Sequence, residues 1–151
     1  MAGACAAPAD TTVVVPTLVP QPGSNVTVPP VPDLDPDLVA VGADLYAANC
    51  AECHGSDLRG DPNWMSPAED GGFRPPPHDS SGHTWHHPDD LLIQIVLTGY
   101  GFDEPQSRMP TFGDTLSREE VEAILEYIKS HWGPEERAFQ WEQTVRSSGG
   151  G

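Results

Sequence analysis

A cluster of two cysteines and a histidine constrains this chain more than any other feature of its sequence. In the stretch YAANCAECHG, two residues separate Cys50 from Cys53, and His54 follows the second cysteine directly. Three chemistries use a C-x-x-C pair: a redox dithiol, half of a zinc site, or, when histidine follows at once, covalent attachment of haem. The rest of the sequence has to distinguish among them.

Zinc and dithiol chemistry both suit the surrounding sequence poorly. A zinc site would need two of His83, His86 and His87, which begin about thirty residues after the cysteines, outside the usual finger spacing. A thioredoxin-like dithiol expects a strand before the motif, whereas a helix is predicted there. Haem attachment gives each residue a role, because the two thiols bond to the porphyrin and His54 binds the iron as proximal ligand. Such attachment takes place outside the cytoplasm.

Helices are predicted on both sides of this cluster. Over residues 37–49 the apolar residues recur at helical spacing, and the stripe comprises Leu38, Val41, Leu45 and Tyr46. A second helix is predicted to start at Pro88, with Asp89 and Asp90 at the positive end of its dipole, and to stop at Gly99.

A third helix is the most clearly marked in the sequence. Ser117 and Glu120 form a capping box, and Leu116 and Val121 stand at the positions of a hydrophobic staple. The helix should end before Gly133. Its buried stripe is predicted to comprise Val121, Ile124, Leu125 and Ile128.

The two ends of the chain differ in composition from its middle. Residues 6–36 contain eight prolines and no basic or aromatic residue, which predicts an extended tether. The alternative is that its Val-rich pieces lie against the domain as irregular strands. We therefore divide the chain into a tether (1–36), a folded domain (37–133), and a short helix with Phe139 and Trp141 followed by a flexible tail (134–151).

The folded domain is predicted to be all-α. No alternating run of useful length indicates a strand, and long loops cover residues 55–87 and 100–115. Three short main helices make a thin core for a domain of this size. A large, buried, apolar cofactor would fill it.

The charge of the chain limits its partners. There are 23 acidic against 7 basic residues, for a formal net charge of −16. Nucleic acid binding is excluded, since phosphate contacts need a basic face, and a partner with a basic docking face is favoured. No apolar run is long enough to span a membrane. Small residues leading to Cys5 in MAGACAAPAD resemble the end of a bacterial lipoprotein signal, so Cys5 is predicted to be lipidated; the alternative is an unrelated free cysteine in the tail.

With the helices and the cluster identified, the stretch VGADLYAANCAECHG resembles the haem-binding segment of class I mono-haem c-type cytochromes. In that family a glycine eight residues before the first cysteine, and an aromatic four residues later, cross the C-terminal helix. Gly42 and Tyr46 match these positions, and Ile124 and Tyr127 match their partners. The resemblance spans residues 37–132. It implies a cytochrome c-like fold around one covalent haem c, and an electron carrier rather than an enzyme, with no small-molecule substrate.

The resemblance also implies the other haem contacts. Met109, followed by Pro110, occupies the place of the family's axial methionine, whereas Met65 lies only eleven residues after His54. In the family a proline carbonyl commonly accepts a hydrogen bond from the proximal imidazole. Here five prolines compete for that role: Pro62, Pro67, Pro75, Pro76 and Pro77.

Further candidates lie in the long loop after the cluster. Arg74 and Trp85 are predicted to donate hydrogen bonds to haem propionates, since the guanidinium fork matches a carboxylate. The histidines of residues 78–87 (His78, His83, His86 and His87) have two interpretations. In the first, one of them is a distal ligand or contacts a haem propionate. In the second, all of them are loop residues that titrate near neutral pH, and we favour this interpretation.

A His/Met pair occupies both axial positions and raises the reduction potential relative to a bis-His pair, which favours electron transfer over catalysis. We therefore expect a cytochrome anchored through Cys5 at the outer face of a bacterial cytoplasmic membrane. There it would pass single electrons between respiratory membrane oxidoreductases. The alternative is a fixed cytochrome subunit of a larger respiratory or dehydrogenase complex. A haem sensor or peroxidase with an open sixth position is the third and least favoured hypothesis.

Overall fold

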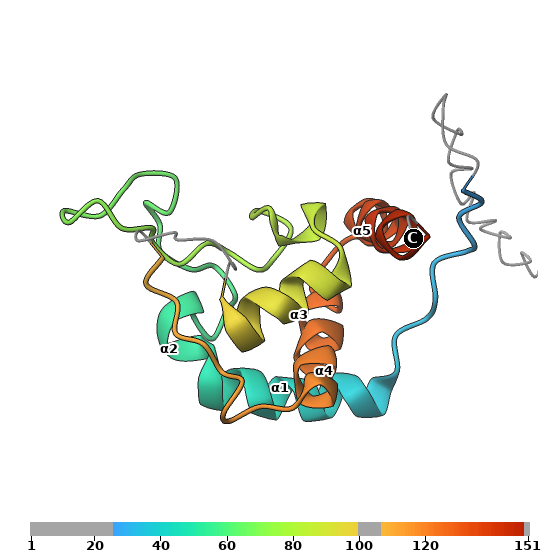
Figure 1. Ribbon diagram of the computed structural model, residues 1–151, viewed down its shortest axis with the longest axis horizontal. Helices are drawn as coiled ribbons and strands as arrows, with labels where there is room; N and C mark the ends of the chain where they lie inside the picture. The colour runs from blue at the N-terminus through green and yellow to red at the C-terminus, as the bar shows by residue number, and fades with distance from the viewer. Residues whose placement is uncertain (1–25, 100–106, 150–151) are drawn as a thin grey trace, which may run out of the picture.

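The structure is a computed structural model that describes residues 26–99 and 107–149. Cys5, the predicted lipidation site, lies outside these ranges. The described residues form helices and no strand, in agreement with the all-α prediction (Figure 1). In chain order the elements are α1 (Pro36–Asn49), α2 (Ala51–His54), the 3-10 helix η1 (Thr84–His86), α3 (Asp89–Thr98), α4 (Arg118–Lys129) and α5 (Pro134–Ser148).

The crossing of α1 and α4 organises the fold. Figure 1 shows α4 standing steeply on α1. At the crossing Gly42 meets the backbone of α4 so closely that a Cβ atom added to it would lie 1.9 Å from the carbonyl oxygen of Ala123. One turn further along α1, the ring of Tyr46 packs on that of Tyr127 at 5.3 Å between centroids. The expected pairing of the two helices is therefore present.

The apolar stripe predicted for α1 is correct only at its C-terminal end. Tyr46 is buried and Leu45 packs against the core, but Leu38 and Val41 are 42% and 50% exposed. The prediction was wrong for these two residues because α1 touches α4 mainly around Gly42 and Tyr46. Leu38 precedes the crossing by one turn, and Val41 lies about 100° around the helix from Gly42.

The sequence signals of α4 are confirmed in detail. Ser117 and Glu120 form a reciprocal capping box, in which each side chain accepts a hydrogen bond from the other residue's backbone N–H. Leu116 and Val121, the staple pair, are both buried. The predicted stripe is buried as well, and it comprises Val121, Ile124, Leu125 and Ile128.

The α3 helix supplies a third wall of the core. It ends at Gly99, which has a φ of +83°, and its buried residues are Leu92, Ile93 and Ile95. Asp89 and Asp90 occupy its first turn as predicted, although Pro88 stands at the N-cap rather than at the first helical position.

The α5 helix and the extended segment 26–35 pack together on the side of the molecule away from α2 (Figure 1). The α5 helix has 15 residues, where a short helix was predicted, and its Gln140 is 2% exposed. Trp141 Nε1 donates to the carbonyl oxygen of Pro29 at 2.9 Å, and Arg137 Nη2 donates to that of Pro32 at 2.6 Å. The described part of the proline-rich region therefore lies along a helix.

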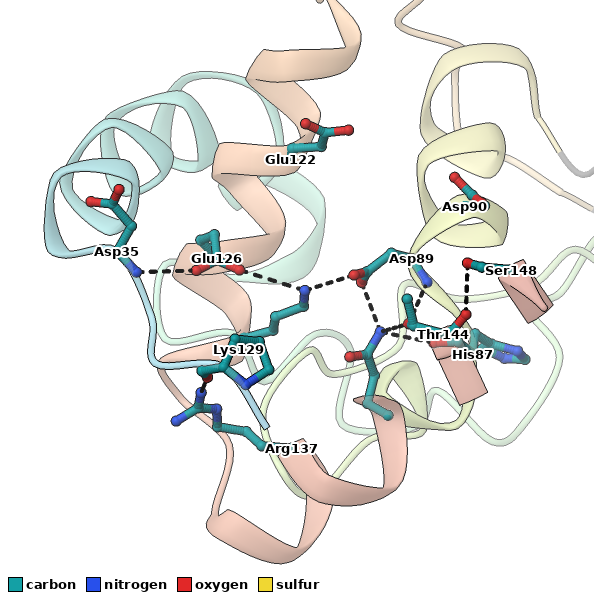
Figure 2. A network of polar contacts seen from close by, with 12 residues as sticks. Asp35, His87, Asp89, Asp90, Glu122, Glu126, Lys129, Arg137, Thr144 and Ser148 are labelled. Atoms are coloured by element: carbon teal, nitrogen blue, oxygen red, sulfur yellow. Dashed lines mark hydrogen bonds and ion pairs between the residues drawn. The ribbon is translucent and has the colours of Figure 1, made fainter. Parts of the chain in front are cut away.

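A polar network joins this region to the rest of the domain (Figure 2). Glu126 accepts from the backbone N–H of Asp35 and pairs with Lys129, which also pairs with Asp89 at the start of α3. Asp89 in turn accepts from the amide of Gln140, which also donates to the carbonyl oxygen of His87. The network thus ties the extended segment, α3, α4 and α5 to one another.

Candidate functional site

The cysteine–histidine cluster forms a short helix at the end of α1. Cys50 caps α2, and His54 is its last residue. Both cysteines are free thiols, Cys50 half-buried and Cys53 exposed. Burial, with a smaller effect from the charge of Cys53, raises the pKa of Cys50 to about 11, so this thiol stays protonated at neutral pH. The phenol of Tyr46 donates to the carbonyl oxygen of Gly55 at 3.0 Å and fixes the end of α2 to the crossing helices.

His54 is buried, with 7% of its surface exposed, and its tautomer follows from one contact. Its Nδ1 lies 2.9 Å from the carbonyl oxygen of Pro76. A carbonyl oxygen only accepts, so Nδ1 carries the proton and Nε2 keeps its lone pair for a metal. Burial lowers the pKa of His54, which keeps the ring neutral. Of the five prolines that compete in the sequence, the structure therefore selects Pro76.

Backbone pairing between residues 58–61 and 75–78 holds the Pro76 carbonyl in place. Asp61 N–H donates to the carbonyl oxygen of Pro75, and His78 N–H donates to that of Leu58. Gly60 has a φ of +59°, and a Cβ atom on it would lie 2.5 Å from the Pro75 oxygen. Only glycine combines this conformation with this close approach. The sequence did not predict this pairing, because the paired residues are distant in the chain and lie in irregular structure.

His78 is a further residue at the site that the sequence did not single out from its neighbours. Its ring stacks on that of His54 at 4.1 Å between centroids and an interplanar angle of 26°. Burial, and next the proximity of His54, hold the pKa of His78 well below its usual value. Two imidazoles that bind one iron from opposite sides cannot stack in this way, so the geometry argues against His78 as the distal ligand.

The other loop histidines pack on aromatic rings. His83 stacks on Trp64 at 5.3 Å between centroids, and His87 meets the edge of His83. His86 is exposed and contacts Trp85 and Phe139. Within residues 26–99 and 107–149 no group of three or more His, Cys, Asp or Glu residues could hold a metal ion. The zinc alternative therefore finds no support in this part of the chain.

Met109 lies in the segment that leads into α4 and is half-buried, whereas Met65 is 82% exposed. Three contacts position this segment. Further along it, Phe112 and Gly113 donate their N–H groups to Val96 and Leu97 at the end of α3. Arg108, next to Met109, forms an ion pair with Asp70 of the loop after α2, and that contact lowers the pKa of Asp70. The segment with Met109 is thus tied to the loop that follows the cysteine cluster.

Arg74 and Trp85, the predicted propionate donors, retain unused donors. Arg74 Nη1 pairs with Asp61 at 3.2 Å, but its Nε is buried and finds no acceptor among the described residues. Trp85 Nε1 is likewise buried and unsatisfied in the part of the chain that the structure describes. Buried donors normally have partners, so both atoms are compatible with an additional acceptor group. Together with the His54 lone pair and two free thiols, these residues fit a haem with propionate side chains.

Comparison with known proteins identifies the family. The family model for cytochrome c oxidase, cbb3-type, subunit III matches residues 37–128. The chain belongs to this family. It is therefore a c-type cytochrome that binds haem c, and an electron carrier rather than an enzyme. Cytochrome domains of this type are typically extracytoplasmic. No helix among the described residues is long and apolar enough to cross a membrane.

Two relatives with names of redox proteins match the chain over a small part of their own length. The fructose dehydrogenase cytochrome subunit of Gluconobacter japonicus is 33% identical over 101 residues, which cover 61% of this chain and 18% of that protein. The quinohemoprotein alcohol dehydrogenase ADH IIB of Pseudomonas putida is 31% identical over 116 residues, which cover 77% of this chain and 14% of that protein. The cytochrome thus spans less than a fifth of either relative. No solved structure matches it significantly.

Proposed function

We propose that this cytochrome carries one haem c, joined by thioether bonds to Cys50 and Cys53, with His54 and Met109 as axial ligands. The observation that carries this proposal is the buried His54, whose Nδ1–H donates to Pro76 and leaves Nε2 free beside two free thiols. When bound, the haem iron supplies the one-electron redox chemistry. The chain's own residues hold the ligands in place and keep water from them, and Arg74 and Trp85 offer donors to the propionates.

The role we propose is transfer of single electrons between membrane oxidoreductases of a respiratory chain at the outer face of a bacterial cytoplasmic membrane. Support comes from the family and from two relatives, one named as the cytochrome subunit of a dehydrogenase and the other as a quinohemoprotein dehydrogenase. Partners with basic docking faces suit the net charge of −16. Anchoring through a lipid on Cys5 is part of this proposal and rests on the sequence alone.

An optical spectrum of the haem-loaded protein tests the ligands. We expect a low-spin c-type spectrum, a weak near-infrared band in the ferric state, and no binding of carbon monoxide in the ferrous state. Met109→Ala should abolish that band and admit carbon monoxide, whereas Met65→Ala, at an exposed methionine, should change neither. Carbon monoxide binding by the unaltered protein would instead mean an open sixth position and a sensor or peroxidase.

A second candidate function is that of a fixed subunit in a larger complex, which the relative named as a dehydrogenase cytochrome subunit favours. Purification from the native membrane separates the two roles. A fixed subunit co-purifies with its partners in constant ratio, and a shuttle does not. Mass spectrometry of the purified protein would in addition show whether Cys5 carries a lipid.

A further inference from the structure

The stacked pair of imidazoles at the site calls for an explanation of its own. His54 needs one hydrogen bond to set its tautomer, and Pro76 provides it. His78 adds a second contact of a different kind, face to face, at 4.1 Å between ring centroids. A hydrogen bond at Nδ1 still allows the imidazole to tilt around that contact. A flat ring stacked on its face restrains this remaining motion.

The ring of His78 is itself held from the side. Its Nδ1 lies 2.8 Å from Thr84 Oγ1. That hydroxyl donates its hydrogen to the carbonyl oxygen of Pro77 at 3.3 Å, and a hydroxyl has only one hydrogen to give. His78 Nδ1 is therefore the donor to Thr84, and this contact fixes both the orientation and the tautomer of the second imidazole.

The backbone of His78 is equally constrained. Its N–H donates to the carbonyl oxygen of Leu58, and its carbonyl oxygen accepts from Trp132 Nε1, each at 2.7 Å. Just before it, Pro77 touches Gly82 so closely that a Cβ atom on the glycine would lie 2.1 Å from the Pro77 oxygen. The Pro76 carbonyl and the His78 ring, which both contact His54, thus belong to one short segment that these hydrogen bonds and close contacts hold in place.

We propose that His78 is a positioning residue for His54: it fixes the plane of the His54 imidazole and excludes water from its face. This inference rests on the proposed role of His54 as iron ligand. His78 is not itself a ligand in this proposal, and Thr84 acts through it. Residues around an axial ligand tune the metal by setting the ligand's orientation and the local dielectric, which is the effect expected here.

Substitutions at two positions test this proposal. A substitution of His78 removes the stacked ring, and a substitution of Thr84 removes the hydrogen bond that orients the ring. His78→Ala opens the face of His54 to water, which stabilises the more highly charged ferric state, so the reduction potential should fall and the ferric g-values should shift. His78→Phe keeps a flat ring on the face of His54 but loses the hydrogen bond to Thr84, so it should shift both readouts by less than His78→Ala does. Thr84→Val leaves the His78 ring in place but removes its acceptor, and should shift both readouts in the same direction by less. Thr84→Ser keeps the hydroxyl group, so its g-values and reduction potential should match those of the unaltered protein.

His131→Ala is the matched control, since this histidine is exposed and contacts Tyr127 on α4. The readouts are the electron paramagnetic resonance spectrum of the ferric protein and its potential by redox titration. The inference is wrong if His78→Ala and Thr84→Val lower the melting temperature but leave g-values and potential unchanged. If His78→Ala does not fold, Thr84→Val alone decides. An unaltered protein that shows no low-spin c-type haem would overturn the proposed function as well, which distinguishes the two failures.

Discussion

Gly60 shows how a single residue without a side chain can position the site. It combines a positive φ with direct contact to the backbone of Pro75 and Pro76. Gly60→Ala should therefore destabilise the fold by about 2–4 kcal/mol, from backbone strain plus a steric clash that moves the Pro76 carbonyl. Urea unfolding measures the loss.

Gly71 is the matched control for that substitution. It too has a positive φ, +81°, but a Cβ atom on it would meet nothing within 4 Å. Gly71→Ala should therefore show the conformational cost alone, about 1 kcal/mol. Equal losses for the two variants would contradict the claim that crowding at Gly60 matters.

The residues of the site differ in how far the sequence could identify them. Cys50, Cys53 and His54 are adjacent in the chain, so one short pattern contains them and their chemistry. The partner of His54 is 22 residues away in a proline-rich loop, and five prolines were equally good candidates. His78 was one of four similar loop histidines. Only the pairing of irregular backbone segments distinguishes Pro76 from the other prolines and His78 from the other histidines. Such pairing has no periodic pattern in the sequence, so it could not be predicted.

At the scale of helices, the α1–α4 crossing depends on the absence of a side chain at Gly42. Alanine usually favours a helix over glycine by about 1 kcal/mol. Gly42→Ala should nevertheless destabilise the protein by at least about 2 kcal/mol, because the new methyl would overlap the backbone of Ala123, which cannot rotate away.

Chemical denaturation of Gly42→Ala and of a neighbouring variant checks this prediction. Val41→Ala, at a half-exposed position one residue earlier, should change stability by no more than about 0.5 kcal/mol. A Gly42→Ala protein as stable as the unaltered one would show that the two helices can separate without cost.

Helix positions followed from the sequence more readily than helix contacts. The capping box and staple of α4 are local signals that marked its start, and the spacing of its apolar residues predicted its buried stripe. The stripe of α1 was wrong at Leu38 and Val41, because burial there depends on where α4 crosses. That pieces of the proline-rich region lie against the domain was only the alternative prediction, and the contact of segment 26–35 with α5 was not predicted. A proline-rich stretch shows no preference in its sequence between solvent and a helix surface.

The contact between α5 and segment 26–35 gives a third prediction. Trp141 and Arg137 are one helical turn apart and bind carbonyl oxygens of Pro29 and Pro32, which are three residues apart, the repeat of a polyproline helix. The double variant Trp141→Phe/Arg137→Gln removes both donors. The amide of Asp35, which ends this segment and donates to Glu126 Oε2, should then exchange hydrogen at least about tenfold faster, the effect of losing about 1.4 kcal/mol of local stability.

Hydrogen exchange followed by mass spectrometry or NMR measures that change. Arg118→Gln serves as the control, because Arg118 pairs with Asp90 and Glu122 on the exposed sides of α3 and α4. Unchanged exchange in the double variant would mean that apolar contacts alone hold the segment.

For the molecule as a whole, charge is the property that composition fixes most directly. The net charge is −16, and acids also neutralise the cations near the site: Asp57 pairs with Arg59, Asp61 with Arg74, and Asp70 with Arg108. The loops after the cysteine cluster therefore contribute little positive field of their own. A reagent that approaches the site should experience mainly the negative charge of the protein.

This argument predicts opposite salt effects for two small inorganic oxidants of the reduced, haem-loaded protein. A cationic cobalt(III) complex should react more slowly as ionic strength rises from about 10 to 200 mM, because salt screens its attraction to the protein. Anionic ferricyanide should react faster over the same range, because salt screens a repulsion. Stopped-flow absorbance at the haem band measures both rates.

The reagents serve as controls for each other, since general effects of salt on the protein would change both rates in the same direction. The result that contradicts the prediction is the reverse pair of slopes. It would mean that Arg59, Arg74 and Arg108 outweigh their acidic partners near the reacting edge, and that the natural partner presents an acidic docking face rather than a basic one. The sign of each slope thus tests the proposal that partners of this cytochrome have a basic docking face.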